Sequence, residues 1–285
     1  MNLLKTVFSI CFQNIRKWSK DYRIWSVAVL TLVMINIYIN DLQEICGKLN
    51  APMPVWVFPF MYQQYYMKVI FTIPLILIFC NAPFIDSNQI YVYLRAGRKK
   101  WLAGQILYIA VASALYYLFI ITAMFIMLFI DGAEFSLQWG KVLKTIAEVN
   151  LSGIGNYPFT LVSDMVIRCF TPVQAMLFTF LVSWSNAVSI GLLIFMFNYL
   201  SNNKIIGSML AAFDIVMSFF VEISGYPWLI KYSPTSWITL DKIDVGGTTE
   251  YPHFEYCMLV YWVMILLLIT AIFLFGRKRE IDLER

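Results

Sequence analysis

The chain has 285 residues, of which 60% are hydrophobic and only 13% are charged, and its formal net charge is +4. Soluble globular domains carry about 25% charged residues. A chain with so little charge cannot cover its surface with polar groups, so the composition excludes a soluble domain. It predicts an all-α membrane protein in which residues 1–285 form one transmembrane domain. The composition predicts the lipid bilayer as a partner, and nothing in the sequence predicts binding to nucleic acid.

The first expected element is an amphipathic helix at residues 3–20. Its apolar positions recur at steps of three and four residues, and they are Leu4, Phe8, Cys11, Ile15 and Trp18. Such positions share one face of a helix, which would lie in the membrane interface with that face in lipid and its basic residues toward anionic headgroups. The alternative is that the segment continues into the first span. The charges between Lys17 and Arg23 argue against this, because each costs a few kcal/mol at the bilayer centre.

Six stretches that are almost free of charge predict transmembrane helices. A helix needs about 20 mostly apolar residues to cross about 30 Å of hydrocarbon. The expected spans are residues 24–40, 69–85, 101–130, 172–199, 205–222 and 256–276.

The segment between the second and third spans predicts a short helix on the inner side. Asp86 or Ser87 can cap its start, and Gly97 can end it in a left-handed conformation. The residues in between are too apolar for a solvated loop, so we expect them to contact a partner protein. The candidate contact residues are Ile90, Tyr91, Tyr93, Leu94 and Arg95. The alternative is a simple turn that carries a basic cluster.

The segment 132–168 is expected on the outer side. Residues 137–149 predict a short helix along the membrane surface, and Gly153, Gly155 and Pro158 would break it. The last outer segment, residues 226–237, contains further prolines and aromatic side chains that suit the membrane interface.

Asp214 is the most informative single residue, because it lies near the middle of the fifth span. A carboxylate in hydrocarbon must face protein or water. One hypothesis is that Asp214, with Asn186, lines a transport pathway and contacts a cationic substrate or a proton. The other is that Asp214 makes a hydrogen bond between helices, to Asn186, Ser183 or Asn36.

Lysine and arginine residues set the expected orientation, because cytoplasmic loops are enriched in them. With the N-terminus in the cytoplasm, about two thirds of the 21 basic residues fall on the inner side, notably in 16–23, 95–100 and 277–279. We therefore expect a multi-pass protein of the cell membrane with both termini in the cytoplasm.

Motifs for catalysis are missing from the sequence. There is no phosphate-binding G-x-x-x-x-G-K-[ST] loop, and the single histidine, His253, excludes an H-E-x-x-H zinc site. The five cysteines form no metal-binding pair. Residues 151–155 echo a signature of ABC ATPases but lie in an outer loop without companion motifs. We therefore expect no catalytic site, metal or cofactor in this chain.

Two runs give the sequence a resemblance to a known family. They are Tyr93-Leu94-Arg95-Ala96-Gly97-Arg98-Lys99-Lys100-Trp101 and Tyr232-Ser233-Pro234-Thr235-Ser236-Trp237. With the topology above, they resemble the permease subunits of type-2 ABC exporters, although the segment 132–168 is longer than is usual there. The resemblance implies an interfacial elbow helix at 3–20, a coupling helix around Ile90–Arg95, a partner ATPase that binds ATP and Mg²⁺, and a second permease subunit, identical or different.

That resemblance implies export of a peptide, a drug or a lipid-like molecule. The alternative function is a non-transporting membrane protein, such as an assembly factor or a sensor. A membrane enzyme is a third possibility, but the sequence offers no catalytic group for it.

Overall fold

The computed structural model describes residues 3–85, 87–148, 161–244, 247 and 249–276, and it contains no β-strand among them. The glycine and proline breaks expected at 153–158, the ATPase-like run at 151–155 and the basic cluster at 277–279 lie outside these residues. The helices are α1 (Leu3–Arg16), η1 (Lys17–Lys20), α2 (Tyr22–Leu49), α3 (Phe58–Met61), α4 (Tyr65–Phe79), α5 (Ser87–Ala96), α6 (Arg98–Ile130), α7 (Gly140–Glu148), α8 (Asp164–Cys169), α9 (Pro172–Ser201), α10 (Ile206–Ile223), α11 (Pro227–Ile230), η3 (Pro234–Ile238), η4 (Leu240–Lys242) and α12 (Phe254–Gly276).

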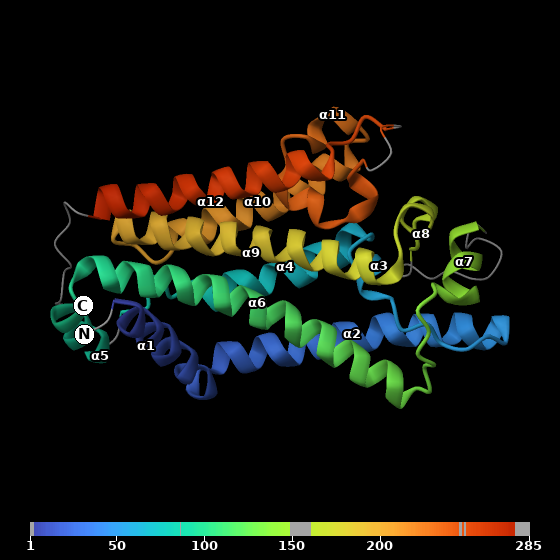
Figure 1. Cartoon of the computed structure of the whole chain (residues 1–285), viewed down its shortest axis with the longest axis horizontal. Helices are drawn as coiled ribbons and strands as arrows, with labels where there is room; N and C mark the ends of the chain where they lie inside the picture. The colour runs from blue at the N-terminus through green and yellow to red at the C-terminus, as the bar shows by residue number, and fades with distance from the viewer. Residues whose placement is uncertain (1–2, 86, 149–160, 245–246, 248, 277–285) are drawn as a thin grey trace.

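The long helices run side by side along the longest axis of the molecule (Figure 1). Helices α1 and α5 lie at one end of this bundle, and α3, α7, α8 and α11 lie at or near the other. These ends are called the α5 end and the α8 end below.

Five of the described helices are long and apolar enough to cross a membrane, namely α2, α6, α9, α10 and α12. Helix α4 is equally apolar, but its 15 residues rise only about 22 Å, which is less than the thickness of the hydrocarbon core. The prediction of an all-helical fold with several candidate membrane spans is therefore confirmed, and the described helices supply five such candidates where six spans were expected.

Two of the expected spans differ from the helices at their ends by more than three residues. Helix α2 continues past Asn40 to Leu49, because its charged last turns form an i,i+4 pair of Glu44 and Lys48 at 3.1 Å and need not lie in lipid. Helix α4 begins at Tyr65 rather than at residue 69, because the charge of Lys68 is paired inside the protein. It ends at Phe79, and Phe84 in the following turn has φ +58°.

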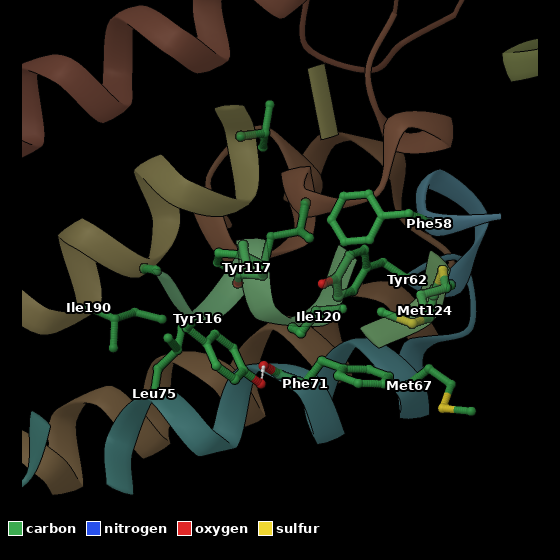
Figure 2. Packing of buried hydrophobic residues seen from close by; sticks show 14 of the residues in the cluster. Phe58, Tyr62, Met67, Phe71, Leu75, Tyr116, Tyr117, Ile120, Met124 and Ile190 are labelled. Carbon is green, nitrogen blue, oxygen red and sulfur yellow. Dashed lines mark hydrogen bonds between the residues drawn. The ribbon is translucent and has the colours of Figure 1, made fainter. Parts of the chain in front are cut away.

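Helix α9 is the centre of the bundle and packs against α4, α6, α10 and α12. Helix α4 also packs against α2 and α10, and a hydrogen bond connects it to α6. Figure 2 shows Tyr116 of α6 donating its hydroxyl to the backbone carbonyl of Phe71 in α4, at 2.9 Å, with Tyr62 and Tyr117 packed nearby. The buried aromatic side chains thus fix the short helix α4 in the bundle.

The outside of the bundle is apolar over long stretches. On α12 the exposed side chains include Leu259, Leu266, Leu267, Leu274 and Phe275. Soluble monomers rarely expose contiguous apolar patches of this kind. This surface agrees with a helix whose outer face contacts lipid.

Helix α1 packs on α6 more closely than its sequence pattern predicts. Leu4 and Phe8 are exposed as expected, but Cys11 is buried against protein rather than in lipid. Asn14, which is not among the apolar positions of this helix, is also buried, and its Nδ2 donates to Gln105 Oε1 at 2.7 Å. Periodicity identifies an apolar face, but it does not show whether lipid or protein covers that face.

The junction of α9 and α10 depends on Asn198 and Gly207. Asn198 Oδ1 accepts from the backbone N–H of Gly207 at 2.8 Å, and its Nδ2 donates to the carbonyl of Ala82 at 3.2 Å. A Cβ on Gly207 would overlap the carbonyl oxygen of Ile194. The small residue at this position therefore allows the two helices to approach closely.

Candidate functional site

The candidate contact residues at the α5 end divide into two groups. Tyr91 and Leu94 are 73% and 69% exposed, and Arg95 is exposed beside them. Tyr93 instead faces α6, because its hydroxyl accepts from Arg98 Nε at 2.7 Å and its ring meets the edge of Trp101 at 5.6 Å. The side chain of Ile90 lies outside the described residues. Tyr91, Leu94 and Arg95 thus form the surface available to a partner.

The ends of α5 and α6 are fixed locally by Gly97 and Trp101. Gly97 separates the two helices with φ +79°, a backbone conformation that glycine adopts without strain. The indole of Trp101 is buried against the bundle. The exposed face of α5 is therefore presented on a rigid support.

A groove of about 310 Å³ runs between α1 and α5. Lys5, Ser9 and Gln13 line it from α1, and Val92 and Arg95 line it from α5. The predicted elbow and coupling segments thus lie next to each other, although they are 70 residues or more apart in the sequence.

Asp214 and Asn186 are connected through Thr235, a residue of η3. Thr235 Oγ1 lies 2.6 Å from Asp214 Oδ2 and 3.1 Å from Asn186 Oδ1. Among the described residues, neither Ser183 nor Asn36 is hydrogen-bonded to Asp214, and Ser183 Oγ has no hydrogen-bond partner at all. The sequence placed Asp214 and Asn186 near each other but gave no signal for Thr235.

The loop that carries Thr235 is inserted into the bundle. Thr235, Ser236, Trp237 and Ile238 are all buried. Tyr261 of α12 donates to the carbonyl of Pro234 at 2.6 Å, and the Trp237 indole donates to the carbonyl of Ile230 at 2.6 Å. A loop that returns into a membrane bundle needs such partners, because unsatisfied polar groups are costly there.

Two roles for Asp214 follow from this geometry. Its carboxylate can join α10 to the inserted loop as a structural acceptor, or it can serve the pathway through its negative charge. The substitution Asp214→Asn separates the two roles, because asparagine keeps an acceptor for Thr235 and removes the charge.

The sequence reasoning missed a buried ion pair between Lys68 of α4 and Glu222 of α10. The side chains are 0% and 5% exposed, and the ammonium contacts Glu222 Oε1 directly. In the sequence, Lys68 directly precedes the expected span 69–85, which is the usual place of a flanking charge. Its position next to a run without charge is the one signal that the sequence offers for burial.

Asp241 and Lys242 of η4 act electrostatically on this pair. Burial disfavours the ammonium of Lys242, but Asp241 at 3.2 Å and the ring of Tyr251 attract it more strongly, and the pKa of Lys242 is raised. The four charges sum to zero, so the ion pair between α4 and α10, together with the two charges of η4 that act on it, forms a charge-balanced network at the α8 end.

Among the residues that the structure describes, no group of three or more His, Cys, Asp or Glu side chains could hold a metal ion. The arrangement is that of an all-helical protein with five candidate membrane spans, with Tyr91, Leu94 and Arg95 exposed at the α5 end and a polar network toward the α8 end. No protein-family model matches the chain, and no curated protein matches it either.

Proposed function

We propose that this chain is the membrane-spanning permease subunit of an ATP-driven ABC exporter. In this proposal α4 completes a set of six spans, α1 with η1 forms the elbow helix, and α5 is the coupling helix. Both termini and the α5 end are cytoplasmic, and the protein belongs to the cell membrane. A separate ATPase subunit binds ATP and Mg²⁺, and a second permease subunit completes the pathway for a peptide, a drug or a lipid-like substrate.

The observation that carries this proposal is the exposure of Tyr91 and Leu94 on a rigidly supported short helix at the α5 end. Large apolar side chains in a water-exposed position favour a protein partner. The adjacent Arg95 supplies a charge that can pair with acidic groups of that partner, and the groove between α1 and α5 supplies a second contact surface. The basic residues near the α5 end support its cytoplasmic position.

Transport then follows from mechanical coupling. When ATP binding brings two ATPase subunits together, each would move the α5 helix attached to it. Because Tyr93 and Arg98 connect α5 to the start of α6, this displacement reaches the bundle directly. The pathway would alternate between inward and outward access as the spans shift.

Substituting Leu94 tests the ATPase contact. We expect Leu94→Asp to lower the ATPase activity that co-purifies with the tagged chain by about tenfold or more, because a buried interface anchor contributes about 2 kcal/mol or more. Leu137→Asp is the matched control, since Leu137 is 68% exposed but lies near the α8 end. The measurement is the vanadate-sensitive ATPase activity of each purified, monodisperse preparation.

Three results would contradict the proposal. The ATPase activity could survive Leu94→Asp at the level of the control. No ATPase could co-purify with the unaltered chain, which would favour an assembly factor or a sensor. Activity of the isolated chain on a small substrate, without any ATPase, would favour a membrane enzyme.

A further inference from the structure

A mixed polar and apolar cavity of about 200 Å³ lies at the α5 end, apart from the groove between α1 and α5. Its polar side is formed by Lys17 of η1, by Asp21, and by Lys204 from the connection between α9 and α10. Ile24, Ile78 and Ile85 line its apolar side. Segments that are far apart in the sequence therefore place two lysines, Lys17 and Lys204, at one cavity that also has an apolar side.

The helix ends around the cavity place it at the boundary between membrane and water. Helix α2 begins at Tyr22, α4 ends at Phe79 and α10 begins at Ile206, all close in sequence to lining residues. Phospholipid phosphates occupy this level, above the hydrocarbon core. A ligand in the cavity would thus have its polar group beside the lysines and its apolar part along the isoleucines.

The polar side of the cavity is held in place by buried hydrogen bonds. Lys17 is half-buried, and its Nζ donates to Asn14 Oδ1 at 3.2 Å, while Asn14 itself donates to Gln105. The Trp18 indole donates to the hydroxyl of Tyr108, a further lining residue, at 2.9 Å. Lys17 is therefore directed along the protein surface rather than outward into water.

The charged residues that line the cavity favour an anion. Lys17 and Lys204 are basic, and Asp21 is the acidic residue among them. The Asp21 carboxylate is engaged as the cap of α2, where it accepts from the backbone N–H of Arg23 at 3.0 Å. The basic lining residues suit a phosphodiester, and basic pockets between transmembrane helices bind anionic lipid headgroups in this way.

We propose that this cavity binds the phosphate headgroup of an anionic phospholipid from the leaflet at the α5 end. The two lysines hold the phosphate, and the apolar wall accommodates the first part of an acyl chain. A bound lipid would contact η1 on one side and the α9–α10 connection on the other. It would therefore stabilise the position of α1 against the bundle.

Native mass spectrometry of the full-length chain in neutral detergent tests this proposal, with added phosphatidylglycerol or phosphatidylcholine. We expect phosphatidylglycerol to bind more tightly, and the double variant Lys17→Gln/Lys204→Gln to lower that affinity by about fivefold or more. Lys20→Gln/Lys99→Gln removes the same charge from exposed lysines that do not line the cavity, so its affinity should stay within about twofold of the unaltered chain. Lys17→Arg/Lys204→Arg should retain binding, which separates loss of charge from loss of fold.

Three outcomes would overturn the assignment. The control variant could lose as much affinity as the cavity variant, which would mean that only the general surface charge attracts the lipid. Both lipids could bind equally well in the unaltered chain. Inorganic phosphate at millimolar concentration could displace phosphatidylglycerol, which would assign the cavity to a free anion instead of a lipid.

Discussion

Replacing Lys68 with methionine is expected to destabilise the protein by about 3–5 kcal/mol, because the change leaves the Glu222 carboxylate buried without a cation. Methionine fills most of the volume of the lysine side chain, so the main effect is electrostatic. Asp241 repels the Glu222 carboxylate more strongly than Lys242 attracts it, so these two residues do not replace the missing ammonium. The measurement is the unfolding midpoint of the purified chain in detergent.

The double variant Lys68→Met/Glu222→Met shows whether the loss comes from the unpaired charge. Replacing both partners of a buried pair by apolar groups is often neutral or stabilising, so most of the lost stability should return. Arg168→Met is the control. Arg168 forms an i,i+4 pair with Asp164, but its side chain is 73% exposed, and surface pairs contribute little. The buried-charge explanation would be contradicted if Lys68→Met lost no more stability than Arg168→Met. It would also be contradicted if the double variant were no more stable than Lys68→Met.

Replacing Gly207 with alanine is expected to destabilise the junction of α9 and α10, although alanine is the better helix former. The favourable change in helix propensity is about 1 kcal/mol. Against it, the new Cβ would overlap the carbonyl oxygen of Ile194 and would lie 2.7 Å from Asn198 Oδ1. Overpacking costs about 1–3 kcal/mol, and here a backbone atom must move, so the net effect should be a loss of stability.

Gly47→Ala is the matched control for this variant. Gly47 also lies in a helix, but a Cβ there meets no atom within 4 Å. Only the propensity effect remains, so Gly47→Ala should raise the unfolding midpoint slightly while Gly207→Ala lowers it. Equal shifts of the same sign in the two variants would show that the close approach of the helices at Gly207 does not restrict the size of the side chain at this position.

The sequence predicts a helical membrane protein because the length of an uncharged run can be read directly from the order of the residues. The ends of the helices are less predictable. Asp41, Glu44 and Lys48 mark the end of an apolar run, but helix α2 continues through all three, because a helix can extend from lipid into water. Charge patterns therefore mark the boundary of the membrane and not the boundary of the helix.

The polar network was predicted only in part, for a physical reason. Asp214 is visible in the sequence because a carboxylate inside an apolar run is costly. Its partner Thr235 is not visible, because threonine is ordinary in a loop, and only the tertiary fold brings that loop inside the bundle. Lys68 and Glu222 are 154 residues apart, so their pairing likewise depends on how α4 packs against α10.

The α5 end must face the cytoplasm if an ATPase is to reach it, and cysteine labelling tests this orientation most directly. Cys169 is exposed in α8, Cys11, Cys46 and Cys257 are buried and Cys80 is half-buried, so the unaltered chain supplies its own reporter for the α8 end. A membrane-impermeant maleimide should label Cys169 in intact cells. It should label the variant Leu94→Cys/Cys169→Ser only after the membrane is permeabilised. Labelling of this variant in intact cells would place α5 outside and contradict the exporter proposal.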